Sequence, residues 1–232
     1  MSELHNPKVA ILASGSGSTA ESYVQTIHNG QVQHEVGLVI SSQPHVGILK
    51  RAERWNKELG FDVQTAVINS DTHPGGQQGR GQTREESEAI VELANENKID
   101  LIATLGYMVI INNPLVEAYC YVPDKHKSMY DARTINTHPG PLPLTADTYG
   151  VKASATAIRA YRRRKITKSQ HTVHVVADDI DAGPIVAAHD VPIKPEDTPE
   201  ELNERTQWIE KATIAYALDK FLRDQKAYRA DA

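Results

Sequence analysis

Short apolar runs alternate with amphipathic stretches along the first half of the chain. The apolar runs are typical of buried strands, and they lie at residues 8–13, 36–40, 63–68 and 101–105. The segments between them carry apolar side chains at helical spacing, at residues 20–28, 46–59 and 83–97. Strands that alternate with helices are typical of a parallel sheet covered by helices. The pattern therefore predicts an α/β fold with a mostly parallel central sheet flanked by helices.

The second half of the chain continues this pattern with less regular spacing. Further strands are expected at residues 134–136, 172–176 and 185–191. Further helices are expected at residues 114–119, 151–163 and 199–223, the last being a long closing helix with a break near its start. Thr83 and Glu86 have the spacing of a capping box, and Thr198 before Pro199 marks the start of the closing helix. Surface loops, the first of them mobile, are expected at residues 69–82 and 121–131.

The composition narrows the class of protein. Of 232 residues, 40% are hydrophobic and 24% are charged, which is typical of a folded globular chain. No apolar run approaches the roughly 18 residues of a membrane-spanning helix, and the first residues lack the pattern of a signal peptide. The single cysteine, Cys120, excludes an internal disulfide and favours a cytoplasmic location. The formal net charge of −5 disfavours a general nucleic-acid binder, but not a phosphate-bearing small molecule.

A glycine-rich loop at residues 14–19 is the first candidate site. Glycines let backbone N–H groups converge, and the start of the following helix favours an anion, so the loop predicts a phosphate site. The loop also fits a loose dinucleotide fingerprint through Gly15, Gly17 and Ala20. That function needs an acidic residue after the second strand, where residues 41–44 have none, so a dinucleotide oxidoreductase is disfavoured. A glycine-rich turn without a ligand stays an alternative.

Two further motifs carry polar side chains suited to catalysis. Asn136 and His138 are two apart on a strand and face the same way, offering an amide and an imidazole to a carbonyl oxygen that becomes negative. The acidic turn at residues 178–183 could place an aspartate beside a histidine as an acid–base pair. A structural Asn and His and a plain acidic turn are the alternatives. Calcium and transition-metal sites are disfavoured because the ligand spacing is absent. The basic run at 162–168 is interpreted as a solvated helix end.

In this order, the Ser-Gly-x-Gly-Ser loop, Asn-x-His-Pro and Asp-x-Asp-Ala-Gly resemble the folate-dependent formyltransferases. The resemblance covers nearly the whole chain. It implies a Rossmann-like formyltransferase fold in a single domain, 1–232, with a long C-terminal helix. Residues of about 1–107 would form the phosphate- and nucleotide-binding half, and about 108–232 the folate-binding and catalytic half.

The glycine loop favours, within that family, the ribonucleotide enzyme of purine synthesis. The resemblance then implies transfer of a formyl group from 10-formyltetrahydrofolate to the amine of glycinamide ribonucleotide. Asn136 and a protonated His138 would stabilise the tetrahedral oxyanion, and Asp181 would keep the imidazolium charged and relay protons. No metal ion and no covalent intermediate are expected. The expected partners are these two small molecules, with no nucleic acid and no membrane, for a monomer or homodimer.

The resemblance also implies binding residues. The ribonucleotide phosphate would be bound by Gly17, Ser18, Thr19 and Gln207, and the glycinamide end by Glu210. The folate would be bound by Arg84, Met108, Val109, Ile111, Val176, Ala177, Asp178 and Asp179. His174 matches a family histidine near the site. Plain alternatives remain for several of these residues: core packing for Met108 and Ile111, and an exposed surface position for Arg84, Gln207 and Glu210.

This chain departs from the family pattern around the substrate pockets. Thr19 stands where the family often has Asn, and Val109 replaces an arginine of the folate pocket. The turn reads Gly-Pro-Leu-Pro at 140–143, and the stretch at 144–149 is longer than usual. A formyltransferase for another amine, such as an amino-sugar nucleotide, is therefore the alternative function. The transfer-RNA formyltransferases and the formyltetrahydrofolate hydrolases are disfavoured by length, and a non-catalytic binding protein by the presence of all three catalytic residues.

Overall fold

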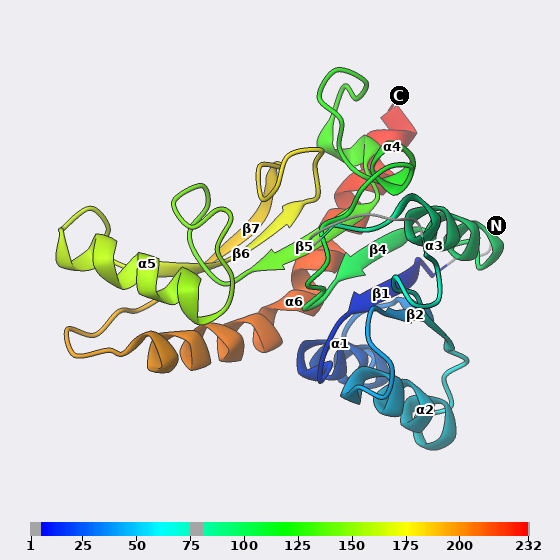
Figure 1. Ribbon diagram of the computed structural model, residues 1–232, viewed down its shortest axis with the longest axis horizontal. Helices are drawn as coiled ribbons and strands as arrows, with labels where there is room; N and C mark the ends of the chain where they lie inside the picture. Colours follow the sequence, from blue (N-terminus) through cyan, green and yellow to red (C-terminus); the bar gives the residue numbers. More distant parts are fainter. Residues whose placement is uncertain (1–5, 75–80, 232) are drawn as a thin grey trace.

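The computed structural model describes residues 6–74 and 81–231 and places one seven-stranded sheet at the centre of the molecule (Figure 1). The strand order is β3-β2-β1-β4-β5-β6-β7. The strands are β1 (Lys8–Ala13), β2 (Glu35–Ser41), β3 (Gln64–Val67), β4 (Leu101–Thr104), β5 (Thr134–His138), β6 (Ser169–Val175) and β7 (Ile185–Val191). Strands β1 to β5 pair in parallel, whereas β6 and β7 are antiparallel to their neighbours. The predicted mostly parallel sheet is confirmed.

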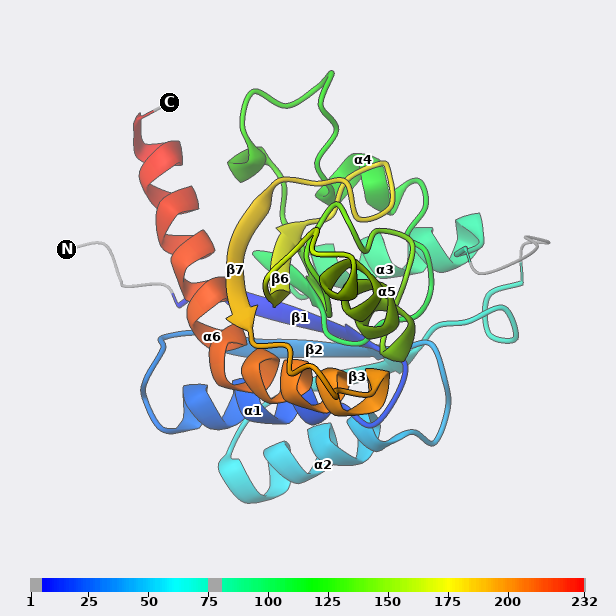
Figure 2. The ribbon, with the colours of Figure 1, turned by 90° about the vertical axis from the view of Figure 1, so that its left-hand side faces the viewer.

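The helices cover both faces of this sheet. They are α1 (Ser18–His28), α2 (Gly47–Leu59), α3 (Arg84–Glu96), α4 (Leu115–Tyr119), α5 (Val151–Arg162) and α6 (Pro199–Asp231), with a 3₁₀ turn η1 (Met129–Asp131). Side chains alternate along β1, so Val9 and Ile11 pack with α1, α2 and α6, while Ala10 and Leu12 pack with α3 and α4. Figure 2 shows these two helical layers on opposite sides of the strands. None of the helices described is long and apolar enough to cross a membrane.

The capping box before α3 is confirmed atom by atom. The Glu86 backbone N–H donates to Thr83 Oγ1 at 3.0 Å, and the Thr83 N–H donates to Glu86 Oε2 at 2.8 Å. These two bonds satisfy N–H groups that lack a partner inside the helix. Of the predicted loop at 69–82, residues 75–80 lie outside the described part of the chain, and its mobility stays a prediction. The predicted loop at 121–131 contains η1.

The closing helix is longer than expected. It is continuous from Pro199 to Asp231, so both the end at 223 and the break near the start are wrong. The last turns lack an apolar stripe but are held by Gln225, whose Nε2 donates to the carbonyl oxygens of Tyr130 and Ala132 at 2.8 Å. Figure 1 shows the axis of α6 turning between its orange and red parts. The hydroxyls of Thr206 and Thr213 bond to the carbonyl oxygens of Leu202 and Ile209, contacts that often bend helices.

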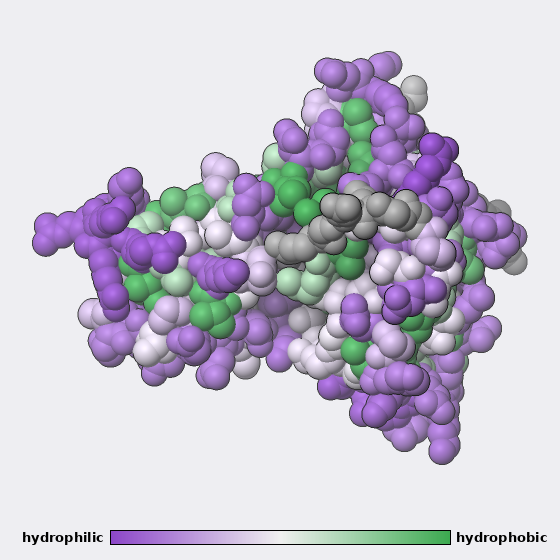
Figure 3. All heavy atoms as spheres, in the orientation of Figure 1, coloured by the Kyte–Doolittle hydropathy of each residue, from purple (hydrophilic) through white to green (hydrophobic). Residues whose placement is uncertain are grey.

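The basic run at the end of α5 is exposed, as the solvated interpretation predicts. Figure 3 shows hydrophilic side chains gathered at this end of the molecule. Arg164 has a φ of 57°, and the N–H of Lys165 bonds to the carbonyl oxygen of Ala160, which closes the last turn of the helix. Lys168 forms an ion pair with Asp190 on β7. The division of the chain into two halves near residue 107 stays a prediction.

Candidate active site

A cleft of about 550 Å³ opens at the carboxyl ends of the parallel strands. It lies beside β1, where the strand order reverses: β2 and β3 follow on one side of β1, and β4 to β7 lie on the other. Ligands in open α/β sheets bind at this position because the loops on either side of the reversal diverge. The lining comprises residues 15–19, 104–111, 136–139, 147–150, 174, 176–181, 207 and 210. The cleft therefore contains every residue predicted for catalysis.

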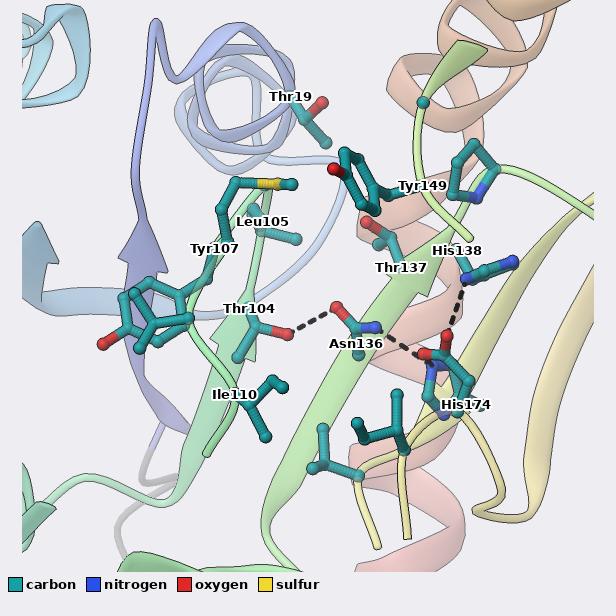
Figure 4. Close-up of a pocket in the computed structure, with 18 of the residues that line it drawn as sticks. Thr19, Thr104, Leu105, Tyr107, Ile110, Asn136, Thr137, His138, Tyr149 and His174 are labelled. Atoms are coloured by element: carbon teal, nitrogen blue, oxygen red, sulfur yellow. Dashed lines mark hydrogen bonds and ion pairs between the residues drawn. The ribbon is translucent and has the colours of Figure 1, made fainter. Parts of the chain in front are cut away.

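The catalytic motifs meet because of the register of the sheet. Thr104 on β4 lies opposite Asn136 on β5, and Asn136 lies opposite His174 on β6. His138, two residues further along β5, has its side chain on the same face. The strand was expected to end at residue 136, whereas β5 extends to His138. Figure 4 shows Asn136 between Thr104 and His174, with His138 beside them.

The imidazole of His138 is buried, with 3% of the side chain exposed, and both ring nitrogens have neighbours. Nε2 lies 2.9 Å from Thr145 Oγ1, and Nδ1 lies 3.4 Å from Asp181 Oδ2. Burial lowers the pKa of His138, while the Asp181 carboxylate and Thr145 act in the opposite direction. Burial therefore favours a neutral imidazole in the free site, and the protonated His138 expected beside the oxyanion stays a prediction.

Thr145 gives His138 a way to change its protonation without moving. The Thr145 hydroxyl is 2.9 Å from His138 Nε2 and 3.0 Å from the carbonyl oxygen of Pro141. When the hydroxyl donates to Nε2, the ring is neutral and its Nδ1–H faces Asp181. When it donates to Pro141, Nε2 must carry a proton of its own. Rotation of one hydroxyl thus accommodates either form of the ring.

Asp181 reaches the histidines from a tight turn after β6. Its φ of 53° is in the left-handed region, which Asp tolerates better than most residues. The carboxylate also lies 3.6 Å from His174 Nε2 and accepts the backbone N–H of Asp147 at 3.3 Å. Of the side chain, 13% is exposed, so it can be reached from the cleft. One carboxylate thus faces two buried imidazoles.

Gly183 is the last residue of the Asp-x-Asp-Ala-Gly motif, and the packing around it requires glycine. A Cβ atom at this position would lie 1.8 Å from the carbonyl oxygen of Val175 on β6. We expect Gly183→Ala to destabilise the protein by about 1–3 kcal/mol through overpacking, and to lower activity because Asp181 shares the displaced turn. Thermal unfolding and a turnover assay test this, with Ala182→Gly in the same turn as the control. An unchanged Tm for Gly183→Ala would contradict the packing argument.

The glycine loop lines the cleft at the start of α1. Gly17 caps α1 with a φ of 71°, and a Cβ there would lie 2.6 Å from a methyl carbon of Ile48. The loop is fixed to the neighbouring strand connection because Met108 N–H donates to Ser14 Oγ at 2.9 Å. Gly17, Ser18 and Thr19 all line the cleft, as the predicted phosphate site requires. A helix start with free N–H groups favours an anion there.

Gln207 and Glu210 line the same cleft from α6. Thr137 donates its hydroxyl to Glu210 Oε1 at 2.9 Å. Burial raises the pKa of Glu210, and the hydroxyls of Thr137 and Thr19 oppose that effect. A carboxylate that is partly removed from water attracts a cation or an amine more strongly than one in open solvent. Glu210 is half-buried and bonded to Thr137, whereas Gln207 is exposed.

The predicted folate residues line the cleft, with one exception. Those in the lining belong to two strand connections: Met108, Val109, Ile111, Val176, Ala177, Asp178 and Asp179. Tyr121 holds the second of them, since its N–H donates to the carbonyl oxygen of Val176 at 2.7 Å. Arg84 is not brought to the lining. It lies on the first turn of α3, 78% exposed, and its Nε donates to Glu88 at 2.7 Å.

Several residues of the site were missed in the sequence analysis. Thr104, Thr137, Thr145 and Tyr149 contact the predicted residues or line the cleft. Thr and Tyr side chains in strands and loops carry no local signal of function. The unusual length of the stretch at 144–149 was the one available signal, and Tyr149 comes from it. Figure 4 shows the Tyr149 ring between Thr19 and His138.

Known proteins resemble this chain over most of its length. The trifunctional purine biosynthetic protein adenosine-3 of Homo sapiens is 28% identical over 217 residues, which are 93% of this chain and 18% of that protein. The chain thus spans less than a fifth of that relative. The phosphoribosylglycinamide formyltransferase of Bacillus subtilis is 27% identical over 203 residues, or 88% of each chain.

Solved structures share the fold. A phosphoribosylglycinamide formyltransferase from Bacillus halodurans matches with a TM-score of 0.72 and 28% identity, covering 93% of this chain and 95% of that one. The enzyme of the same name from Brucella melitensis matches with a TM-score of 0.73 and 26% identity, covering 94% and 96%. The sequence model described as formyl transferase matches residues 7–218. This chain belongs to the formyl transferase family.

Proposed function

We propose that this chain transfers a formyl group from 10-formyltetrahydrofolate to the amine of glycinamide ribonucleotide, the reaction of a phosphoribosylglycinamide formyltransferase in purine synthesis. The observation that carries the proposal is one cleft with three parts. Asn136, His138 and Asp181 line the same cleft as a glycine loop suited to an anion and two strand connections, 105–111 and 176–181. A phosphate-bearing acceptor and a folate donor would then meet at the catalytic residues.

The chemistry requires charge to develop on one oxygen. The acceptor amine attacks the formyl carbon, a C–N bond forms, and the formyl oxygen becomes an oxyanion. The amide of Asn136 donates an N–H to that oxygen. The attacking nitrogen then loses a proton, the folate nitrogen gains one, and the bond from the formyl carbon to the folate nitrogen breaks as the carbonyl reforms.

His138 and Asp181 would manage these protons as a pair. The Asp181 carboxylate is reached from the cleft and lies 3.4 Å from His138 Nδ1, so a proton taken from the amine can be shared between them. Burial, which lowers the pKa of His138, keeps the ring ready to accept a proton at neutral pH. The imidazolium would then exist during the reaction, while the oxyanion is present, rather than in the free enzyme.

Glu210 would bind the amine end of the acceptor, and we expect Glu210→Gln to weaken acceptor binding but raise the Tm at neutral pH. Burial raises the pKa of Glu210, so the folded state disfavours its charged form. The charged carboxylate therefore destabilises the folded state above the raised pKa. This destabilisation disappears as the pH falls towards about 4, where the carboxyl is neutral in both the folded and the unfolded state. The gain in Tm should therefore be largest near neutral pH and vanish in acid.

Thermal unfolding across pH and the KM for the acceptor measure this. Glu204→Gln is the control, because Glu204 is exposed on the same helix. A lower Tm for Glu210→Gln at neutral pH would show that the carboxylate stabilises the fold instead.

The function is tested by mixing the purified protein with a 10-formylfolate donor and glycinamide ribonucleotide and following deformylation of the donor by absorbance. Loss of formyl donor that depends on the acceptor is expected. Samples without acceptor, and with an amino-sugar nucleotide in its place, run alongside. Turnover with the amino-sugar nucleotide alone would replace the proposed acceptor and keep formyl transfer.

Some wider expectations belong to the same proposal. The single cysteine, buried and free, favours a cytoplasmic enzyme. The folate role of Arg84 would require its exposed side chain to leave Glu88. The oligomeric state and the absence of a metal from the reaction stay predictions.

A further inference from the structure

Three neighbouring strands place one side chain each in a row across the floor of the cleft. Thr104, Asn136 and His174 are paired by the register of β4, β5 and β6 and point to the same face. Thr104 Oγ1 lies 2.6 Å from Asn136 Oδ1, and His174 Nε2 lies 3.1 Å from Asn136 Nδ2 (Figure 4). The row therefore contacts the Asn136 amide from both sides.

The protons in this row can be assigned from chemistry. The carbonyl oxygen of Val175 can only accept, and it lies 3.1 Å from His174 Nδ1, so Nδ1 carries a hydrogen. In the neutral ring, Nε2 is then an acceptor, and Asn136 Nδ2 can donate to it. Asp181 Oδ1 is 3.6 Å from the same nitrogen, which is beyond hydrogen-bond distance. Burial favours the neutral ring, since it lowers the pKa of His174.

Thr104 completes the assignment at the other end of the amide. Its hydroxyl can donate to Asn136 Oδ1 at 2.6 Å or to the carbonyl oxygen of Ile135 at 3.3 Å, and the shorter contact has the stronger geometry. An amide turned by 180° would place its oxygen against the lone pair of His174 Nε2, which is repulsive. The Thr104 hydroxyl would then accept from the NH₂ group and could donate only to the carbonyl oxygen of Ile135, at the longer distance of 3.3 Å. The row therefore favours one orientation.

We propose that Thr104 and His174 are positioning residues that fix the orientation of the Asn136 amide, so that its second N–H faces the cleft. This deepens the proposed function and rests on it, because that N–H is the donor to the oxyanion. An amide carries two N–H groups, and His174 takes one of them. Neither Thr104 nor His174 needs to touch the substrate. Their effect is to exclude the orientation that would present a carbonyl oxygen to a developing negative charge.

The test uses Thr104→Val, which keeps the shape of the side chain and removes the hydroxyl. Loss of one hydrogen bond of ordinary strength is expected to lower kcat about tenfold, with the KM values for donor and acceptor unchanged. Thr104→Ser restores the hydroxyl and should recover most of kcat. A drop in kcat that serine does not recover would overturn the proposal.

A double-mutant cycle separates positioning from a general structural effect. Thr104→Val should have no further effect on the residual activity of an Asn136→Ala enzyme, because the group that it positions is gone. Equal loss in both backgrounds would overturn the proposal, since it would show that Thr104 acts independently of Asn136.

Nitrogen-15 NMR of the histidine rings gives a readout without turnover. His174 should have an unprotonated Nε2 in the wild type, and the Nε2 signal should shift in Thr104→Val and in Asn136→Ala. A protonated Nε2 in the wild type at neutral pH would overturn the assignment even if the Thr104 variants failed to fold. Absence of turnover by the wild type would instead count against the proposed function, while the NMR result would still decide the orientation of the amide.

Discussion

Replacing His138 by alanine is expected to lower kcat by about 10²–10⁴-fold, the range for loss of a positioned acid–base group. The imidazole is the partner of Asp181 at 3.4 Å, so its removal leaves the carboxylate without the group that shares its proton. The same substitution removes the contact to Thr145. A steady-state assay of formyl transfer measures the effect, with circular dichroism to show that the fold is kept.

Two control variants sharpen this result. His138→Gln retains a hydrogen-bonding side chain but cannot titrate, so it should fold well and remain as inactive as the alanine variant. His28→Ala removes an exposed histidine at the end of α1 and should be fully active. Turnover near the wild-type level in His138→Gln would show that proton transfer does not pass through this ring.

The pH dependence of the wild type adds to the same test. Because burial lowers the pKa of His138, a requirement for the neutral ring makes kcat/KM fall only below the ordinary histidine pKa of about 6.5. A requirement for the imidazolium in the free enzyme would give the opposite limb, with kcat/KM falling as the pH rises. Whether kcat/KM falls at low pH or at high pH therefore shows whether the free enzyme needs the neutral ring or the imidazolium of His138.

Replacing Asn136 by alanine is expected to lower kcat by about 10²–10³-fold, the cost of losing one donor to an oxyanion. The KM values should change little, because the donor acts on charge that appears after the substrates have bound. Asn136→Asp is expected to be at least as inactive, since a carboxylate of the same shape repels a negative oxygen. Single-turnover kinetics measure the chemical step directly.

Asn29→Ala serves as the control for this variant, because Asn29 is an exposed residue at the end of α1. An Asn136→Asp enzyme that keeps wild-type turnover would show that the amide N–H is not the oxyanion donor. A rise in KM with unchanged kcat would assign Asn136 to substrate binding instead.

Much of the fold follows from local sequence. Alternation of apolar runs with amphipathic stretches located the strands and helices of the first half, because burial on a sheet and on a helix face requires different periods. Thr83 and Glu86 marked the start of α3 for a local reason, since a capping box is made by residues three apart. The end of α6 was missed because Gln225 is held by carbonyl oxygens of residues more than ninety positions away.

The site was predictable only in part. Asn136 and His138 share one strand face, so their proximity follows from a period of two. The place of Asp181 came from a family resemblance, and no local rule puts a turn at 178–183 beside β5. Arg84 shows the opposite case, because a residue matched by position lies exposed on α3 beside Glu88.

The sequence by itself determined the elements of this protein, the polarity of their faces and the identity of the motifs, since each depends on residues a few positions apart. Only the tertiary structure decided which residues meet. The pairing of Thr104 with Asn136 and of Asn136 with His174 is a matter of strand register, which depends on packing across the whole sheet. The neutral state favoured for the buried histidines has the same origin, because it depends on how much protein covers each ring and which carboxylate lies beside it.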